Sequence, residues 1–194
     1  GFVREAGSEP VHYGIVKDDL KELKDVCKKA VKQTDMVLIS GGSSVGTRDY
    51  TVDVLSSLLD TTILIHGMSI SPGKPTILAK SGIKSVWGLP GQVVSAMVVF
   101  KIVVVPFLNR IKGLDTINRQ IKIPAKLVRN VSSSQGRSDF VRVLLEYSNG
   151  EVLARPVLGK SGLIRTMVHA DGLLEIGENV EGLEKDTMVN IILL

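Results

Sequence analysis

A helical apolar pattern that leads directly into a short apolar run constrains the fold of this chain more than any other feature. From Asp18 to Gln33 the apolar residues recur at helical spacing, and the first aspartate is suited to capping the free N–H groups of a helix. The run Met36 to Ile39 follows and ends in a loop of glycine and serine, which is typical of a buried strand. A chain built from such units buries its strands beneath helices, so we expect an α/β fold.

The same alternation continues to about residue 113. We expect a second helix, then three strands, then a long closing helix, over Asp49–Leu59, Thr62–Ile65, Thr76–Ala79, Ser85–Leu89 and Gln92–Ile111. Strands that alternate with helices predict a mostly parallel sheet covered on both faces, with ligands at the carboxyl ends of its strands. The first domain is therefore expected to be a three-layer α/β domain over residues 1–113.

The character of the sequence changes beyond Gly113. Short β-type segments are separated by Asn-Gly and Ser/Gly turns, at Ile121–Val131, Phe140–Tyr147, Val152–Ala154 and Met188–Leu193. They predict a small all-β domain over residues 119–194, after a linker at about Lys112–Asn118.

The first fifteen residues suggest that a strand is missing. Gly1–Gly7 reads as the tail of a helix and Val11–Ile15 as a strand, but no strand precedes that helix. We therefore expect the chain to be truncated at its N-terminus.

Composition narrows the classes of function. The formal net charge is only +4, aromatic residues make up 4% of the chain, and the basic residues are scattered, so nucleic acid is a poor candidate partner. The longest apolar run, Val93 to Leu108, is interrupted by Lys101 and Pro106, and we interpret it as a buried helix rather than a membrane span. A single cysteine, Cys27, and no visible secretory signal favour the cytoplasm.

A loop rich in glycine follows the first strand and precedes the second helix. Gly41, Gly42 and Gly46 allow the backbone to turn tightly and to present N–H groups to an anion, although such loops are also common as plain turns. Asp49 ends this loop. Its carboxylate either binds Mg²⁺ beside a phosphate or caps the following helix, because the two roles compete for one side chain.

Two further loops have similar chemistry. In Ser71–Pro75 a lysine, Lys74, lies between two prolines, which lowers the entropy cost of aiming its ammonium group at an anion. A solvated loop lysine is an equally good interpretation of the sequence. The turn Gly88–Gly91 ends a strand and opens the long helix, whose first turn contains Ser95. Three such loops at strand ends indicate an anion-binding site.

Other possible sites are weaker. The three histidines, His12, His66 and His169, have no zinc spacing and are interpreted as structural. Trp87 is expected to pack in the core, and the serines lack the nucleophile elbow of a serine hydrolase.

Taken together, the loop sequences closely resemble the MoeA-type molybdopterin molybdenumtransferases. The resemblance rests on DMVLISGGSSVGTRDY (Asp35–Tyr50), HGMSISPGKPT (His66–Thr76) and GLPGQVVSA (Gly88–Ala96), and in the second domain on RSDFVRV (Arg137–Val143), ARPV (Ala154–Val157), GKSG (Gly159–Gly162) and ADGL (Ala170–Leu173). It implies a molybdopterin-binding-type α/β domain followed by the family's C-terminal β domain.

The resemblance also implies an activity. Members of the family cleave adenylylated molybdopterin and ligate molybdate to its dithiolene sulfurs in a Mg²⁺-dependent step that releases AMP. Asp49 would hold the metal, and Asp49 and Lys74 would be catalytic. The cofactor-binding residues would be Gly41, Gly42, Ser43, Ser44, Gly46, Pro72, Gly73, Lys74, Pro90, Gly91 and Ser95.

This sequence departs from the family pattern at two positions and in length. Ser71 replaces a residue that is usually basic, and Val93 replaces a usual proline, so we expect weaker anion binding and a less pre-organised pocket. Family members carry two further domains and form homodimers that complete the cleft with residues of the partner chain. The parent protein is therefore expected to be an enzyme, and the fragment alone to be inactive.

Two alternatives remain open at this point. The chain could be a molybdopterin-binding scaffold module without turnover, like the related domain of gephyrin, or belong to the adenylyltransferase branch, against which the β domain argues. The sequence does not distinguish molybdate from tungstate as the metal.

Overall fold

The computed structural model describes residues 1–41, 50–114, 120–157 and 165–194. The chain forms two compact units. Unit 1 contains Gly1–Met68 and Gly73–Gln92, and unit 2 contains Ser69–Pro72 and Val93–Leu194. This division follows packing, and the domain boundary expected at residues 113–119 remains a separate prediction.

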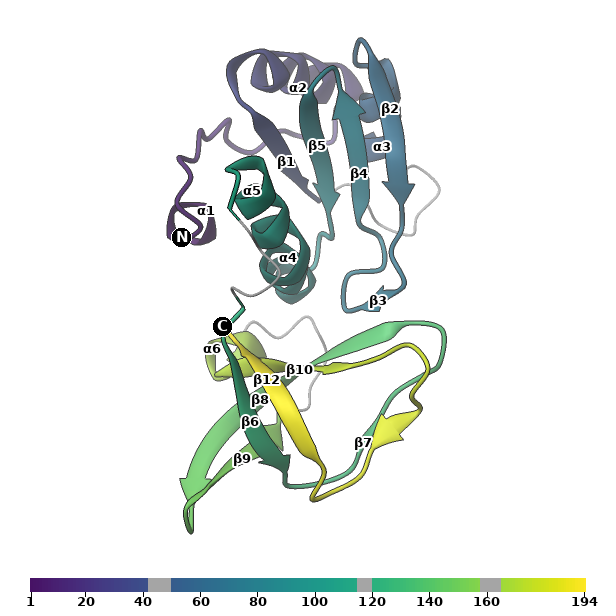
Figure 1. Cartoon of the computed structure of the whole chain (residues 1–194). Helices are drawn as coiled ribbons and strands as arrows, with labels where there is room; N and C mark the ends of the chain where they lie inside the picture. The colour runs from purple at the N-terminus through teal and green to yellow at the C-terminus, as the bar shows by residue number, and fades with distance from the viewer. Residues whose placement is uncertain (42–49, 115–119, 158–164) are drawn as a thin grey trace. The chain divides into compact units, whose positions relative to one another are not determined.

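Unit 1 is built on a four-stranded sheet of order β1-β5-β4-β2 (Figure 1), with strands β1 (Met36–Ser40), β2 (Thr61–His66), β4 (Ile77–Ser81) and β5 (Lys84–Leu89). The predicted strands are thus confirmed, but the mostly parallel sheet is not. Of the pairs among the described strands, β1–β5 is parallel, whereas β5–β4 and β4–β2 are antiparallel. The reason is the connection between β4 and β5, two residues at Gly82 and Ile83, because a parallel pair needs a much longer crossover.

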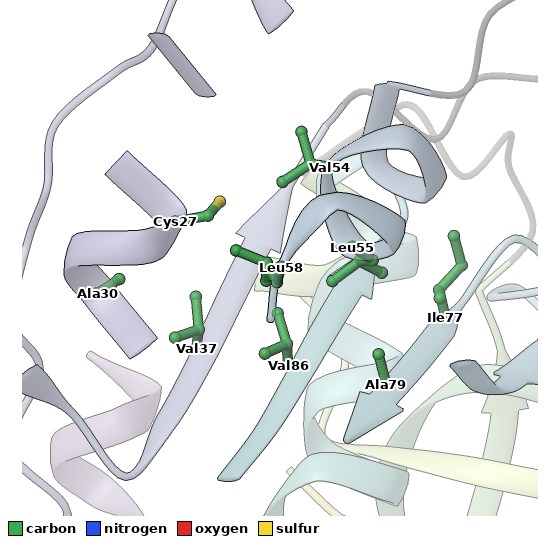
Figure 2. Packing of buried hydrophobic residues seen from close by; sticks show 9 residues of the cluster. All are labelled: Cys27, Ala30, Val37, Val54, Leu55, Leu58, Ile77, Ala79 and Val86. Atoms are coloured by element: carbon green, nitrogen blue, oxygen red, sulfur yellow. The ribbon is translucent and has the colours of Figure 1, made fainter. Parts of the chain in front are cut away.

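Two helices cover one face of this sheet, α2 (Leu20–Gln33) and α3 (Tyr50–Ser57). Figure 2 shows their apolar side chains packed over Val37, Ala79 and Val86 of three strands. Cys27 lies in this core with 3% of its surface exposed, as its place on the apolar face of the helix predicts. A helical layer on the opposite face stays a prediction, since both of these helices share one side.

The N-terminal segment corrects two expectations. A short helix, α1 (Phe2–Glu5), is present, but Val11–Ile15 forms no strand, and Val11 and Ile15 are exposed. The cap of α2 is Asp19 rather than Asp18. Its extended backbone lets its carboxylate accept the N–H of Glu22 at 2.8 Å.

A long helix opens the main part of unit 2. It runs from α4 (Val93–Val99) through a wider π-helical segment, η1 (Phe100–Val104), into α5 (Val105–Ile111). The wide turn has a local cause: Pro106 has no N–H and its ring clashes with the preceding turn, and the helix widens just before it, where the Val105 N–H bonds to the Phe100 carbonyl. In the described part of the chain this helix, Val93–Ile111, is long and apolar enough to cross a membrane, by length and composition only. Val94 and Val98 are fully buried and pack against the other elements of unit 2.

The rest of unit 2 is a closed β-barrel. Its strands follow the order β10-β12-β6-β9-β8, and β8 pairs again with β10, which closes the ring. Their bounds are β6 (Lys122–Leu127), β8 (Ser138–Ser148), β9 (Glu151–Pro156), β10 (Gly172–Ile176) and β12 (Met188–Leu193). Shorter elements are β3 (Ile70–Ser71), β7 (Val131–Ser132), β11 (Gly182–Leu183) and the helix α6 (Arg165–Val168). The expected all-β character is confirmed for the described residues beyond 119, apart from α6.

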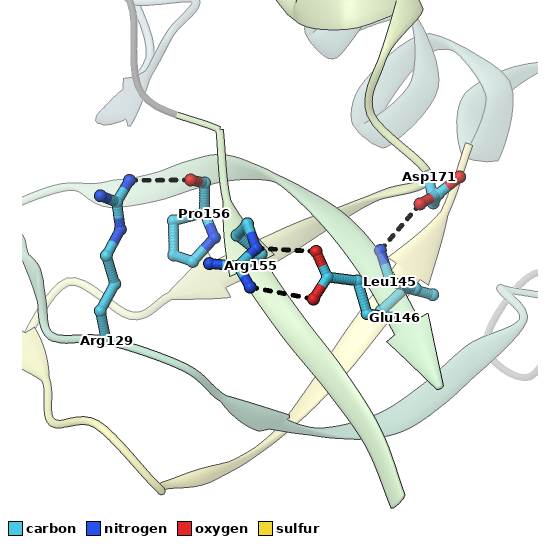
Figure 3. Close-up of polar contacts among 6 residues, drawn as sticks. All are labelled: Arg129, Leu145, Glu146, Arg155, Pro156 and Asp171. Atoms are coloured by element: carbon cyan, nitrogen blue, oxygen red, sulfur yellow. Dashed lines mark hydrogen bonds and ion pairs between the residues drawn. The ribbon is translucent and has the colours of Figure 1, made fainter. Parts of the chain in front are cut away.

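Side chains of the barrel strands alternate between two apolar clusters. Val143, Leu174 and Ile191 belong to the inner one, whereas Leu173 and Ile192, each one position away, pack with α4 in the outer one. Polar contacts hold the strands in register. In Figure 3 the Asp171 carboxylate accepts the backbone N–H of Leu145 at 2.7 Å.

A second set of contacts lies between β8 and β9. Arg155 donates two hydrogen bonds to the Glu146 carboxylate, at 2.7 and 2.9 Å, and Arg129 donates one to the Pro156 carbonyl at 2.8 Å (Figure 3). The hydrogen bond from Arg155 lowers the pKa of Glu146. This pair therefore stays ionised on the exposed side of the hairpin.

Candidate functional site

The loops predicted to bind an anion begin at one edge of the unit 1 sheet. Ser40, the last residue of β1, lies opposite Leu89, the last residue of β5. The first residue of β4, Ile77, lies opposite both Gly88 of β5 and His66, the last residue of β2. Because β4 runs antiparallel, its start meets the ends of its neighbours, and the mixed sheet brings the loop ends together as a parallel sheet would.

Two glycines mark the place where two of these loops meet. A Cβ atom added to Gly91 would lie 3.5 Å from the Cα atom of Gly41, which is ordinary van der Waals contact. Gly41 has a φ of +100°, a conformation that strongly favours glycine. The backbones at Gly41 and Gly91 are therefore neighbours, and apart from the two chain neighbours of Gly91, no side chain of the described residues lies within 4 Å of its Cβ position.

The first turn of α3 lies against the same edge. Thr51 is fully buried, and its hydroxyl group donates a hydrogen bond to the Gly41 carbonyl at 3.4 Å. Gly88 allows this approach, because a Cβ atom there would lie only 2.8 Å from the Thr51 Cγ2 atom. The start of α3, with its positive dipole end, is thus placed beside Gly41 and Gly88.

The Lys74 loop is closed by its own hydrogen bonds. The Lys74 carbonyl accepts the N–H of Met68 at 2.9 Å, and the Thr76 carbonyl accepts the N–H of Gly67 at 2.9 Å. Thr76 is fully buried and its hydroxyl group donates to the Gly73 carbonyl at 2.6 Å. The backbone of Lys74 is fixed in this way, while its side chain is exposed to solvent.

The other predicted site residues divide into two groups. Gly42, Ser43, Ser44, Gly46 and Asp49 lie outside the described residues, so their roles remain predictions. Pro90 is buried in unit 1 beside Gly91, whereas Pro72 and Ser95 belong to unit 2, and Ser95 is 4% exposed. The geometry brings together Gly41, Thr51, Gly88 and Gly91.

Within residues 1–41, 50–114, 120–157 and 165–194, no group of three or more His, Cys, Asp or Glu side chains could hold a metal ion. A metal caged by protein ligands alone therefore finds no support in this part of the chain. The metal site suggested by the sequence would need fewer protein ligands. Mg²⁺ is commonly bound by one or two carboxylates together with substrate phosphate and water.

Arg142 is a partly buried charged residue that the interpretation of the sequence did not single out. It lies on β8 opposite Leu173, and burial lowers the pKa of its guanidinium group. A signal was available, because Arg142 is two positions after Phe140 and therefore shares the face that packs against α4.

Comparison with known proteins agrees with this architecture. Residues 1–110 match a family described as "Probable molybdopterin binding domain", and residues 124–194 match the "MoeA C-terminal region (domain IV)". A Methanocaldococcus jannaschii protein whose name refers to molybdopterin biosynthesis is 38% identical over 100% of this chain and 45% of its own length. The molybdopterin molybdenumtransferase of Bacillus subtilis is 27% identical over 98% of this chain and 44% of its own length.

A solved structure is similar as well. The molybdopterin biosynthesis MoeA protein of Pyrococcus horikoshii has a TM-score of 0.82 and 37% identity, covering 99% of this chain and 45% of that one. This chain thus spans less than half the length of these relatives.

The fold and the loop edge define an α/β molybdopterin-binding-type domain joined to a β-barrel. The chain belongs to the MoeA-type molybdopterin molybdenumtransferase family and corresponds to its C-terminal two-domain portion, which places it in molybdenum cofactor biosynthesis.

Proposed function

We propose that this chain carries the pterin-nucleotide and anion-binding region of a molybdopterin molybdenumtransferase. In the proposed reaction, adenylylated molybdopterin is cleaved, molybdate is ligated to the dithiolene sulfurs, and AMP is released. Support comes from the family membership and from the names of the relatives.

One structural observation carries the proposal. The backbones at Gly41 and Gly91 lie next to each other without side chains, and the first turn of α3 is held beside them by Thr51. Such an edge combines glycine backbone with the positive dipole end of a helix, which suits a phosphate group. The phosphate of the adenylylated pterin is the chemical group that we assign to it.

The remaining roles follow from the chemistry of each side chain. Gly42, Ser43, Ser44 and Gly46 would extend the phosphate cradle, and the ammonium group of Lys74 would attract phosphate or molybdate. Asp49 would hold Mg²⁺, which when bound would neutralise phosphate charge. Gly73 and Pro90 would shape the pocket in unit 1, and the assignment of Pro72 and Ser95 to it rests on the resemblance alone.

Calorimetric titration of this chain with adenylylated molybdopterin, with and without Mg²⁺, tests the proposal. We expect Mg²⁺-dependent binding that is lost in an Asp49→Ala variant. Asp53→Ala is the matched control, because Asp53 is an exposed carboxylate in the first turn of α3. Equal affinity of the Asp49→Ala and Asp53→Ala variants would contradict the assignment of Asp49.

Turnover is proposed for the whole parent protein, as a homodimer in the cytoplasm. Molybdate insertion should be assayed there, because this chain spans only 45% of the length of its relatives. The barrel disfavours the adenylyltransferase alternative, since its match is to a MoeA region. Binding and oligomerisation of the parent protein without molybdate insertion would favour the scaffold alternative.

A further inference from the structure

The loop that carries Lys74 is shared between two packing environments. Met68 and Gly73 belong to unit 1, but the four residues between them, Ser69–Pro72, belong to unit 2. Within those four residues β3 runs parallel to the start of β8, with Ile70 opposite Ser138 and Ser71 opposite Asp139. The chain therefore forms a strand that pairs with β8 of the barrel three residues before it reaches Lys74.

Two contacts hold this short strand. The backbone N–H of Ser138 donates to the Ser69 carbonyl at 2.9 Å, and the Ile70 side chain packs against the outer apolar cluster of unit 2. Ser138 is the first residue of β8 and, in the described strand pairs, lies opposite β3, whereas pairing with β10 begins at Asp139. The Ser138 N–H therefore bonds to the segment that carries β3 and takes no part in the pairing of β8 with β10.

The charge next to β3 is balanced. Asp139 is 8% exposed, and its carboxylate accepts hydrogen bonds from Ser133 at 2.7 Å and from Arg137 at 2.9 Å. Directly opposed residues of paired strands face the same side, so this carboxylate lies on the side of Ser71. The Arg137 guanidinium neutralises this carboxylate, so it does not repel an anion from the neighbouring Lys74 loop.

We propose that the β3–β8 strand pair positions the Lys74 loop, with the Ser138 N–H and the Ile70 side chain as positioning groups for anion binding. The inference rests on the proposed function of Lys74. The hydrogen bonds within the loop already hold Gly67, Met68 and Thr76, and the β3–β8 pair adds contacts at Ser69 and Ile70. The pair thus lowers the conformational entropy that remains to be lost when an anion binds.

A backbone substitution separates positioning from folding. Ser138→Pro removes the N–H that bonds to Ser69 at a strand start, where proline is tolerated, and Ser138→Ala is the matched control that keeps it. Hydrogen exchange should rise about fivefold to tenfold at Met68 and Gly67, and stay unchanged in β5 and β10. An Ile70→Ala variant, which alters no backbone group, should show the same local pattern.

Affinity measurements then test whether the β3–β8 pair acts through Lys74. With adenylylated molybdopterin as the probe, Ser138→Pro should weaken affinity about fivefold, and should add no further loss in a Lys74→Ala background. Unchanged exchange at Met68 and Gly67 in both β3 variants, or fully additive losses of affinity, would overturn the positioning role. A wild-type chain that binds no probe, but whose loop exchange rises in the variants, would instead refute the proposed function and leave positioning intact.

Discussion

The Cα atom of Gly41 lies 3.5 Å from the point that a Cβ atom would occupy at Gly91. The two residues are 50 positions apart in the chain, and the parallel pair β1–β5 brings them together by placing Ser40 opposite Leu89. This approach joins two of the three loops assigned to the substrate.

A methyl group at Gly91 should impair binding without impairing folding. Because no atom of the described residues would come closer than 3.5 Å and φ lies outside the left-handed region, Gly91→Ala should change the free energy of unfolding by less than about 0.5 kcal/mol. Affinity for adenylylated molybdopterin should fall about tenfold, since the methyl group would occupy the space that we assign to the phosphate. Calorimetry and urea denaturation measure the two quantities, and an unchanged affinity would remove Gly91 from the site.

Gly88→Ala should instead destabilise unit 1. Its Cβ atom would lie 2.8 Å from the Thr51 Cγ2 atom and 3.3 Å from the Ile77 Cβ atom, and overpacking of this kind costs about 1–3 kcal/mol. Thr51→Ser removes Cγ2 but keeps the hydroxyl group that bonds to Gly41. In urea denaturation the double variant should recover part of the loss, and strictly additive losses would show that Thr51 is not the obstacle.

Glycines in the barrel provide a contrasting pair. A Cβ atom at Gly172 would clash with the Ile191 side chain and with the Ile192 carbonyl, and the latter is backbone that cannot rotate away. Gly172→Ala should therefore cost about 3 kcal/mol or more. At Gly177 nothing lies within 4 Å, so Gly177→Ala should be neutral or stabilise the chain by up to about 1 kcal/mol. Thermal unfolding of both variants tests this, and equal melting temperatures would contradict the expected clash.

The thiol of Cys27 should be unreactive in the folded chain. Burial raises its pKa from 9.0 to about 11. At pH 8 this lowers the thiolate fraction about 100-fold, so labelling by a disulfide reagent should be at least that much slower than in urea. Labelling at equal rates in both conditions would mean that α2 is not packed on the sheet.

The same shift makes stability depend on pH. The folded state holds the neutral thiol and the unfolded state ionises more easily, so the stabilisation is fully present below about pH 9 and is lost as pH rises through about 11. A Cys27→Ala variant should lack this part of the alkaline decline in urea denaturation, even though its overall stability is lower. If the stability of the variant declined as steeply with pH as that of the wild type, titratable groups other than the Cys27 thiol would cause the decline.

The sequence predicted the elements of unit 1 better than their directions. Met36–Ile39 and Ser85–Leu89 were recognisable as strands because apolar content and turn residues are local signals, but these signals carry no information on whether neighbouring strands run parallel. The two-residue connection at Gly82 and Ile83 did indicate the direction, because so short a connection allows only an antiparallel pair. Val11–Ile15 has a strand-like composition yet forms no strand, because a strand also needs a partner, which no local pattern supplies.

The candidate site was predictable to a similar degree. Glycines 41, 88 and 91 were recognisable because loops at strand ends have a distinctive composition. The fit of Gly88 under Thr51 and the anchoring of Ile70 beside Ser138 were not, since both depend on residues distant in sequence. Arg142 was missed although its position two residues after Phe140 was a local signal that it shares the apolar face of the strand.

The wide turn at Phe100–Val104 fixes how the long helix can change in length. A π turn accommodates one extra residue, and in a regular helix each residue turns the chain by about 100°. Deleting one residue there would relax the turn to regular α-helix and leave the faces of both helical halves where they are. Deleting one residue between Val105 and Leu108 would instead rotate the buried Leu108 by about a quarter of a turn relative to α4. The helix therefore has one place at which its length can change by a residue without altering which side chains it buries.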